Sequence, residues 1–263
     1  MSPVRPGNYA EQARTYDLTR GASTTVARTI ARFLGPPEGQ RLLDIAGGTG
    51  NYARVMQARG FDAYVTDVAP AMLARSVPKI GPGRQVVADA VALPFGDATF
   101  DRAIIVTAIH LIRPPMRALE EARRVLRDGP LVVAAFTREN VRPLFIRDYF
   151  PTGHIPFDEN PPREELLAWM REAGFGRVEW ERFVYLDSAD GSLVSLHTDP
   201  NRLAGPAYLR NTSFFQRLPE DQRAQGLARL AEDLRSGLLE EKVRRAFEES
   251  VREGHGTVFA CWP

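Results

Sequence analysis

The feature that most constrains the fold is a glycine-rich turn that follows a short apolar run, in the segment Leu42-Leu43-Asp44-Ile45-Ala46-Gly47-Gly48-Thr49-Gly50. A helix-like segment, residues 51–60, comes directly after the turn, so the expected unit is a strand, a turn and a helix. Glycines allow the backbone to take conformations closed to other residues, and they let a ligand approach the chain closely. The unit therefore predicts a ligand site at the carboxyl end of the first strand.

Two further strands are expected to end in acids. A second apolar segment, 63–66, runs into Asp67, and a third, 84–88, runs into Asp89-Ala90. The carboxyl ends of parallel strands meet at one edge of an open α/β sheet, which is where ligands of such sheets bind. Three acids at that edge suit a ligand with many hydrogen-bond donors, such as a nucleoside.

Strand-like and helix-like segments alternate over residues 41–137, which predicts a parallel sheet covered by helices on both faces. A helical stretch at 8–34, which Gly21 interrupts, precedes these alternating segments. It is followed by an aromatic, proline-rich loop at 138–162 and by about seventy residues that look helical. The expected strands are 41–45, 63–67, 84–88, 102–108, 131–136, 177–186 and 257–262, and the expected core helices are 50–59, 70–77, 115–126 and 163–173.

Composition narrows the classes of protein. The 263 residues carry a formal net charge of +1, so no overall field favours nucleic acid. The single cysteine, Cys261, excludes an internal disulfide and a multi-cysteine metal site, and the histidines lack metal-ligand spacing, so we expect no metal. No signal peptide and no apolar run of membrane-spanning length is visible, so we expect a cytoplasmic protein with no membrane partner. A monomer and a homodimer both remain open.

Taken in order, these motifs resemble the class I S-adenosylmethionine-dependent methyltransferases, in particular bacterial small-molecule enzymes with a ubiquinone-methyltransferase-like core. The resemblance rests on the segments 42–50, 65–73, 89–101, 108–111 and 121–131. It implies a Rossmann-like α/β fold with a seven-stranded mixed sheet in the order 3-2-1-4-5-7-6, helices on both faces and a helical cap. It also implies S-adenosyl-L-methionine as cofactor, S-adenosyl-L-homocysteine as product and a small-molecule acceptor.

The resemblance also implies a division of the chain and roles for the turn. Residues 1–40 would form an N-terminal helical lid, 41–186 with 256–263 the cofactor-binding core, and 187–255 a helical insert that caps the substrate. The turn, comprising Ala46, Gly47, Gly48 and Gly50, would pass under the methionine part of the cofactor. Many members have glycine where this chain has Ala46, and a methyl group there is tolerable if the local φ is negative.

The remaining cofactor contacts are implied residue by residue. Asp44 would help to fix the amino group of the cofactor, directly or through the turn, and Asp67 would accept hydrogen bonds from both ribose hydroxyls. The other implied contacts are Val68 and Met72 at the adenine, Asp89 and the backbone amide of Ala90 at its amino group, and Thr107 near the sulfonium.

Residues outside the turn are expected to complete the site. Tyr16 and Arg20, on the N-terminal helices, would contact the carboxylate of the cofactor or close the site. His110 follows the fourth strand, where its ordinary pKa would suit a general base at neutral pH; a hydrogen-bonded histidine that only shapes the pocket is the alternative. Tyr16 is the second catalytic candidate. Tyr149 and His154, in the aromatic loop, are candidates for a substrate wall together with His110; anchoring the loop to the core is the alternative for Tyr149.

Other classes of function compete with this interpretation. A nicotinamide dehydrogenase also uses a glycine turn and an acid after the second strand, but its G-x-G-x-x-G spacing fails at Ala46 and Asn51. The favoured function is methyl transfer to O, N or C of a small, aromatic or largely apolar acceptor in specialised metabolism. The alternatives are an RNA or protein methyltransferase and a member that binds the cofactor without turnover.

Overall fold

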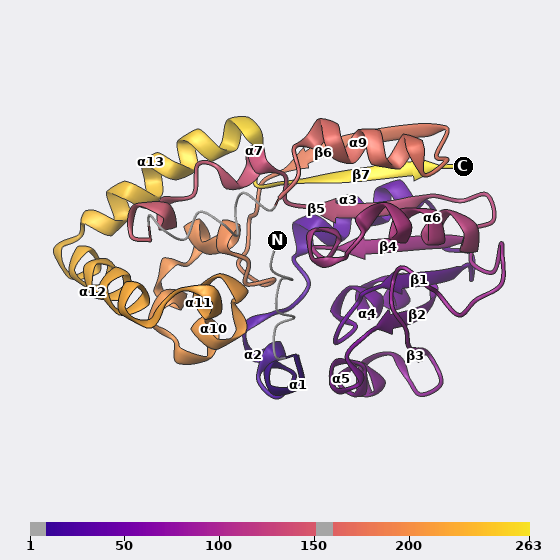
Figure 1. The fold of residues 1–263 in the computed structure, drawn as a ribbon, viewed down its shortest axis with the longest axis horizontal. Helices are drawn as coiled ribbons and strands as arrows, with labels where there is room; N and C mark the ends of the chain where they lie inside the picture. The colour runs from indigo at the N-terminus through magenta and orange to yellow at the C-terminus, as the bar shows by residue number, and fades with distance from the viewer. Residues whose placement is uncertain (1–8, 151–159) are drawn as a thin grey trace.

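The strands form one seven-stranded sheet in the order β3-β2-β1-β4-β5-β7-β6, as expected. The first five pair in parallel, and β7 runs antiparallel to both of its neighbours. This computed structural model describes residues 9–150 and 160–263 (Figure 1). The strand bounds are β1 Arg41–Ile45, β2 Asp62–Asp67, β3 Gln85–Val87, β4 Arg102–Val106, β5 Leu131–Ala135, β6 Arg177–Phe183 and β7 Gly256–Trp262. The predicted fold class is therefore confirmed.

Helices cover both faces of the sheet because its central strands are apolar on both sides. Leu42 of β1 packs in the cluster of α3 (Thr24–Leu34), α4 (Asn51–Ala58) and α5 (Pro70–Ile80). Its neighbour Leu43 points to the other face. There it packs in the cluster of α6 (Pro115–Val125) and α9 (Arg163–Glu172). The core helices thus end within a few residues of the predicted bounds. Cys261 of β7 is buried in the second of these clusters, that of α6 and α9.

The insert forms a helical cap beside the sheet, on the left of Figure 1. The aromatic loop joins it, because Phe150 makes edge-to-face contacts with Phe214 and Phe215, at ring-centroid distances of 5.7 and 5.5 Å. A Cβ atom on Gly226 would lie 2.1 Å from the Phe150 ring, so glycine is needed there for α12 to pack. The cap elements are η3 Leu193–Thr198, η4 Pro200–Ala204, α10 Pro206–Asn211, α11 Ser213–Arg217, α12 Glu220–Ser236 and α13 Leu238–Glu253.

Short helical turns lie in segments expected to be irregular. After β4 comes η1 (Ile109–Leu111), and the loop after β5 contains α7 (Arg138–Val141) and η2 (Phe145–Asp148). The helical N-terminal stretch is divided into α1 (Tyr9–Gln12), α2 (Tyr16–Thr19) and α3. Among the described residues, no helix is both long enough and apolar enough to cross a membrane.

The N-terminal helices and the insert are joined by hydrogen bonds between side chains and backbone, although they lie almost two hundred residues apart in the chain. Asn211 of α10 donates through Nδ2 to the Thr15 carbonyl, at 2.9 Å, and to the Thr19 hydroxyl, at 2.8 Å. The Thr15 hydroxyl donates back to Asn211 Oδ1 at 3.1 Å. In Figure 1, α1 and α2 accordingly lie between the cap and the core.

Candidate functional site

The glycine turn after β1 is held in place by the end of β2. The Gly47 amide donates to the Thr66 carbonyl, and the Gly48 amide donates to Asp67 Oδ2, both at 2.9 Å. Gly48 and Gly50 have φ values of +56° and +72°, in the left-handed region that favours glycine. The turn therefore needs glycine at these positions for its shape.

Ala46 departs from what we expected of it. Its φ is +55°, so the negative φ that would make its methyl group tolerable is not present. An alanine in the left-handed region costs on the order of 1–2 kcal/mol. Thr107, at the facing end of β4, also has a positive φ, of +51°. Two strained non-glycine residues thus border the same pocket, a pattern that is typical of functional sites.

Asp44 is the most strongly perturbed acid of the core. The residue is 1% exposed, and its Oδ1 has no hydrogen-bond partner within the described chain. Burial raises the pKa of Asp44 to about 8, with a smaller contribution from the charge of Asp67. A Cβ atom on Gly47 would lie 2.5 Å from the Asp44 carboxyl carbon, so glycine is required where the turn crosses this side chain. A cationic group entering the pocket would supply the missing partner.

Asp67 is placed as the resemblance implies, at the end of β2. It accepts one backbone N–H on each oxygen, from Gly48 and from Ala69, both at 2.9 Å. Each carboxylate oxygen can accept a second bond, so capacity for a diol remains. Burial raises the pKa of Asp67, and the backbone bonds oppose that shift. Hydrogen bonds from a bound diol would stabilise the ionised form further.

The expected adenine contacts lie next to the turn. Met72 is buried in α5, and its Cε would be 3.5 Å from a Cβ on Gly48, whereas Val68 is exposed at the rim. At the end of β3, Asp89 is exposed and accepts a bond from the Val91 amide at 3.1 Å, and Ala90 beside it is buried. These four residues follow the two neighbouring strands, so the structure places them along one edge of the sheet.

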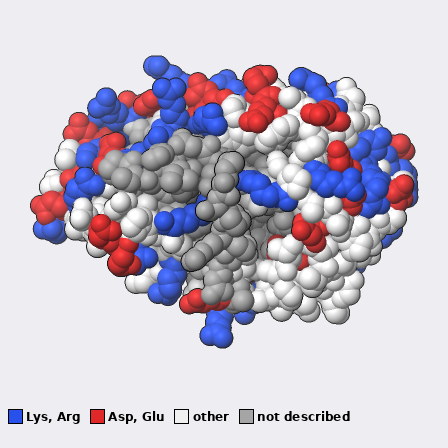
Figure 2. All heavy atoms as spheres, viewed as in Figure 1, with Lys and Arg blue, Asp and Glu red and all other residues white. Residues whose placement is uncertain are grey.

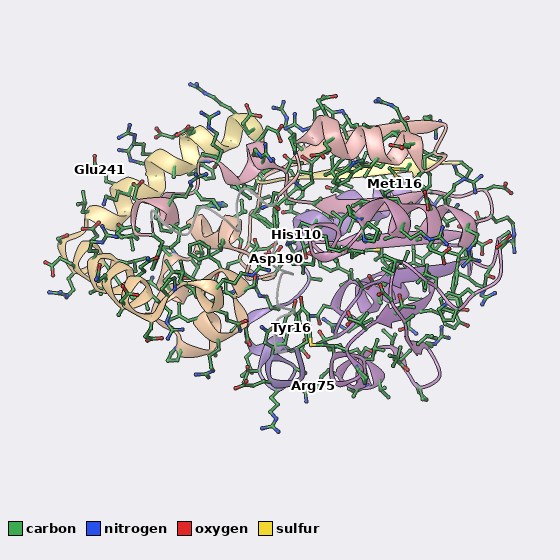
Figure 3. The ribbon with its side chains drawn as sticks, viewed as in Figure 1. Tyr16, Arg75, His110, Met116, Asp190 and Glu241 are labelled. Atoms are coloured by element: carbon green, nitrogen blue, oxygen red, sulfur yellow. The ribbon has the colours of Figure 1, made fainter. Side chains whose placement is uncertain are left out.

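A pocket joins the core to the N-terminal helices and the cap. It encloses about 490 Å³ together with its open mouth, a size that suits a small-molecule ligand. Tyr16, His110 and Asp190 are labelled at this junction in Figure 3. The lining residues are Tyr16, Arg20, Gly21, Asp44, Ala46, Gly47, Gly48, Thr49, Asn51, Tyr52, Val106, Thr107 and Asp190. Five of the predicted cofactor contacts of the core, and both of those on the N-terminal helices, therefore line one pocket.

Arg20 lines the pocket but is committed to the cap. Its guanidinium donates to the backbone carbonyls of Asp190 and Asn211, each at 3.2 Å, and to the carbonyl of Gly191. It also donates to the Thr212 hydroxyl at 3.0 Å. In this arrangement Arg20 bonds the end of α2 to the cap. Its predicted contact with a ligand carboxylate stays a prediction.

Asp17 fastens the other side of α2 to the core, a role that we did not predict. Its Oδ1 accepts bonds from Thr49 Oγ1 at 2.7 Å, Lys79 Nζ at 2.8 Å and Asn51 Nδ2 at 3.2 Å. Thr49 belongs to the glycine turn and Asn51 begins α4. The Asp17 carboxylate therefore bonds α2, which covers the pocket, to the core residues beneath it. The residues around Asp17 form an ordinary helical pattern, so the sequence gives no sign of this contact and only the folded structure shows it.

His110 lies at the end of β4, as expected, but its pKa is not near neutrality. Burial, together with the positive charges of Arg217 and Arg113, lowers the pKa of His110 to about 4. The expectation of a base with an ordinary pKa is therefore wrong, and the imidazole is neutral at physiological pH. Its Nδ1 is buried and has no hydrogen-bond partner among the residues described, and His110 is not one of the residues that line the pocket.

The three remaining catalytic and substrate candidates are Tyr16, Tyr149 and His154. Burial raises the pKa of Tyr16, against the opposing charge of Arg20, so its phenol stays protonated at neutral pH. Tyr149 is 2% exposed inside the cap, where its hydroxyl donates to Asp233 Oδ2 at 2.6 Å. The structure thus gives Tyr149 the anchoring role and does not bring it to the pocket. His154 lies outside the described residues.

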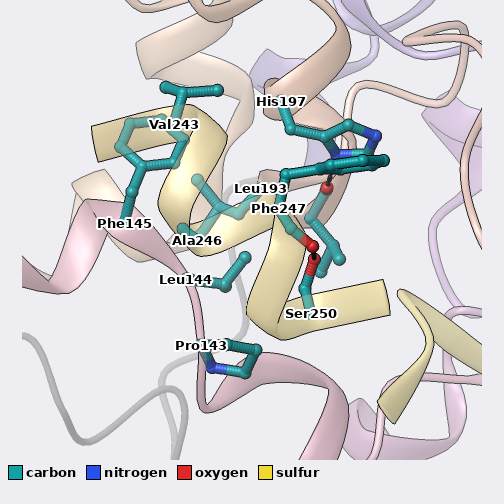
Figure 4. Close-up of a pocket in the computed structure, with 10 residues that line it drawn as sticks. Pro143, Leu144, Phe145, Leu193, His197, Val243, Ala246, Phe247 and Ser250 are labelled. Atoms are coloured by element: carbon teal, nitrogen blue, oxygen red, sulfur yellow. Dashed lines mark hydrogen bonds between the residues drawn. The ribbon is translucent and has the colours of Figure 1, made fainter. Parts of the chain in front are cut away.

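A second hollow lies within the cap, between η2, η3 and α13 (Figure 4). His197 and Ser250 line it, and the rest of its lining is mostly apolar. His197 Nδ1 bonds to the Val194 carbonyl at 2.8 Å, and the Ser250 hydroxyl donates to the Phe247 carbonyl at 2.9 Å. Because these polar groups are already bonded within the protein, the hollow carries no reactive group for a site. In addition, no group of three or more potential metal ligands is found in the described ranges.

The pocket residues fit the cofactor that the resemblance implies. The partnerless carboxylate oxygen of Asp44 suits an ammonium, the free capacity of Asp67 suits a ribose diol, and the turn leaves no side chain between them. Gly47 and Gly48 are the positions where a side chain would displace Asp44 or approach Met72. The donor and acceptor groups of this chain therefore match a nucleoside that carries an amino-acid tail.

Comparison with known proteins agrees with this match. A family model described as a methyltransferase domain matches residues 43–134. The chain is 35% identical, over 194 residues, to a ubiquinone/menaquinone biosynthesis C-methyltransferase of Paracoccus denitrificans. That alignment covers 62% of this chain and 78% of the relative.

Two solved structures share the fold. A putative methyltransferase from an antibiotic biosynthesis pathway of Anabaena variabilis has a TM-score of 0.77 at 23% identity, covering 93% of this chain and 99% of that one. The phosphoethanolamine N-methyltransferase 2 of Haemonchus contortus, solved with S-adenosyl-L-methionine, has a TM-score of 0.61 at 16% identity and covers 96% of this chain and 57% of that one.

Proposed function

Because the chain belongs to the class I S-adenosylmethionine-dependent methyltransferases, with a core like that of the ubiquinone methyltransferases, we propose that it methylates a small acceptor. S-adenosyl-L-methionine is its cofactor. The proposed acceptor is flat, aromatic or largely apolar, and belongs to specialised metabolism. The atom that receives the methyl group is an oxygen, a nitrogen or a ring carbon.

The observation that carries this proposal is that α2 lies over the pocket and covers it. The α2 helix is bonded to the core through Asp17 and to the cap through Arg20, so the methionine end of the site is covered. A covered pocket admits a small molecule, whereas an RNA or a folded protein needs an open groove around the reacting atom. Charge points the same way, because Figure 2 shows basic and acidic side chains interspersed on the visible face.

The protein's own contribution would be positioning and exclusion of water. The cofactor, when bound, supplies an electrophilic methyl group on a sulfonium. Asp44 and Asp67 would bind its polar ends, while Thr107 and the turn would fix its place against the acceptor. Holding two reactants in line is a large part of the rate enhancement that such a site can provide. The cap and α2 would keep water out, which favours loss of charge in the transition state.

His110 would act on the acceptor as a neutral group. Its Nδ1 can accept a hydrogen bond from an acceptor hydroxyl, or donate one, according to its tautomer. With a pKa of about 4 it is a weak base, so it suits an acceptor that is already ionised or only needs orientation. We therefore expect no break near pH 6.5 in the rate profile from this histidine.

The choice among acceptor atoms has partial support. The Paracoccus relative is named as a C-methyltransferase of quinone biosynthesis, which favours an electron-rich ring. Its alignment leaves more than a third of this chain unmatched, because it covers 62%. The acceptor therefore need not be the same quinone, and a related aromatic ring of specialised metabolism fits the proposal.

The test is methyl transfer from methyl-labelled S-adenosyl-L-methionine into fractionated extract of the host and into reduced quinones. We expect label in a small-molecule fraction, with the acceptor identified from its mass, and none with Asp67→Ala. Label in RNA or protein would contradict the proposed substrate class. Absence of label in every fraction, with S-adenosyl-L-homocysteine bound tightly, would contradict turnover and favour a member that only binds the cofactor.

A further inference from the structure

Asp190 is an acid of the cap that lies in the cofactor pocket, and nothing in the sequence singled it out. It follows β6 at the start of the insert, lines the pocket and is 8% exposed. Its charge affects Tyr16 and Tyr52, which also line the pocket, so its carboxylate is near them. Figure 3 places it between the cap and the core, above Tyr16.

The carboxylate of Asp190 is held rigidly by neutral donors. Its Oδ1 accepts the Ser192 amide at 2.9 Å, and its Oδ2 accepts the Tyr185 hydroxyl. The Ser192 side chain also bonds this carboxylate, so one of its about four acceptor positions remains. Neutral hydrogen bonds alone do not offset the cost of burying a charge, and burial raises the pKa of Asp190 accordingly. The side chain is thus fixed, buried and short of a cation.

The nearby arginine does not provide that cation directly. Arg20 lowers the pKa of Asp190 through its charge, but all of its described hydrogen bonds go to other groups. These are three backbone carbonyls, including that of Asp190 itself, and the Thr212 hydroxyl. The pocket therefore carries one buried carboxylate on each wall, Asp44 from the core and Asp190 from the cap. The partnerless Oδ1 of Asp44 independently indicates that a cationic ligand enters between them.

We propose that Asp190 is a second acidic contact for the ammonium group of the cofactor, which the cap contributes opposite Asp44. An ammonium has three N–H donors, so a single carboxylate does not satisfy it. Asp190 lines the same pocket as Asp44 and lies near Arg20 and Tyr52, whereas Met72, which is expected at the adenine, does not line this pocket. This places it at the amino-acid end of the ligand.

One consequence concerns the order of binding. A contact between the cofactor and the cap would hold α2 and the cap more firmly over the pocket, because Arg20 also bonds the carbonyls of Asp190 and Gly191. The acceptor site, which the cap helps to form, would then be complete only after the cofactor has bound. This inference rests on the cofactor and not on the identity of the acceptor.

The experiment compares ligands with and without the ammonium. Calorimetric affinities are measured for S-adenosyl-L-homocysteine, S-adenosyl-L-methionine and 5′-methylthioadenosine, an adenosine thioether that lacks the amino-acid tail. Asp190→Asn keeps the shape and can still accept the Ser192 amide. We expect it to weaken the first two ligands about 10–100-fold, the size of a charged hydrogen bond, and to change the third less than about twofold.

A matched control comes from the same loop. Asp187 accepts bonds from Ser23 and Thr24 at the start of α3 and does not line the pocket, so Asp187→Asn should leave the ratio of the ligand affinities unchanged. If Asp190→Asn does not fold, Asp190→Glu retains the charge but displaces it, and the same selective loss is expected. Thermal unfolding shows that each variant is folded.

Three results would overturn the proposal. Equal losses for all three ligands would mean that Asp190 only maintains the shape of the pocket. A loss confined to S-adenosyl-L-methionine would assign Asp190 to the sulfonium instead of the ammonium. No loss would mean that it does not touch the ligand. None of these results depends on methyl transfer, so failure here is distinguishable from failure of the proposed acceptor class.

Discussion

Asp44→Asn is expected to stabilise the ligand-free protein at neutral pH. Burial raises the pKa of Asp44 from its ordinary 3.8 to about 8. Between these values the unfolded chain releases a proton that the folded protein keeps, so the free energy of unfolding falls as the pH rises. The slope for one such group is about 1.4 kcal/mol per pH unit, which gives about 3 kcal/mol between pH 5 and pH 7. Asparagine has no proton to release, so the variant escapes this loss.

The assay is urea unfolding of both proteins without ligand at pH 5, 6 and 7. The advantage of Asp44→Asn over the wild type should grow by about 3 kcal/mol across this range, because the pH lies between the two pKa values throughout. Asp128→Asn, at an exposed acid after α6, is the control and should show no such growth. A difference between Asp44→Asn and the wild type that stays constant with pH would refute the reasoning.

Cofactor binding should reverse the sign of this effect. An ammonium beside Asp44 favours its ionised form, so binding of S-adenosyl-L-homocysteine should release a proton and tighten as the pH rises from 5 to 7. Burial also raises the pKa of Asp67 and of Asp190, so these acids contribute to the same trend. The comparison that isolates Asp44 is therefore between the wild type and Asp44→Asn, which should bind more weakly and with a smaller pH dependence.

Two substitutions in the glycine turn should change different properties, one the affinity for the cofactor product and the other the stability of the fold. Gly47→Ala places a Cβ 2.5 Å from the Asp44 carboxyl carbon, so the side chain must move, and calorimetry should show S-adenosyl-L-homocysteine bound at least about tenfold more weakly. Ala46→Gly relieves a φ of +55°, which costs about 1–2 kcal/mol, while the greater freedom of glycine in the unfolded chain offsets part of that gain. The free energy of unfolding in urea should therefore rise by about 0.5–1 kcal/mol. A less stable Ala46→Gly variant would show that the methyl group of Ala46 makes packing contacts that outweigh the strain.

The core could be predicted from the sequence because its strands are buried on both faces. Such strands are apolar throughout, as at 131–135, and they end where a polar residue meets the edge of the sheet. Asp44 and Asp67 were found for that reason, since each ends or nearly ends a strand before a turn. The exact backbone of the turn was not predictable, because the positive φ of Ala46 follows from how the turn meets β2 and α4.

The residues of α2 and the insert that cover the pocket could not be predicted, because contacts between distant parts of the chain bring them together. Asp190 lies in an irregular loop with no periodicity, and Arg20, which holds it, is 170 residues away. The one available signal was the acid and glycine pair, Asp190-Gly191, at the point where the chain leaves the sheet for the insert. His110 was found by position, but its pKa depends on Arg217 of the cap, which no local pattern brings near it.

The contacts of α2 make the lid and the cap one unit, and this has a consequence for specificity. Arg20 bonds the Asn211 carbonyl and the Thr212 hydroxyl, while Asn211 also bonds the α2 segment through its side chain. A change in α10 that suits a new acceptor will therefore shift α2 as well. Because Asp17 ties α2 to Thr49 in the glycine turn, that shift is transmitted to the cofactor. We therefore expect that substitutions in α10 that alter acceptor choice will also change the affinity for the cofactor, through α2.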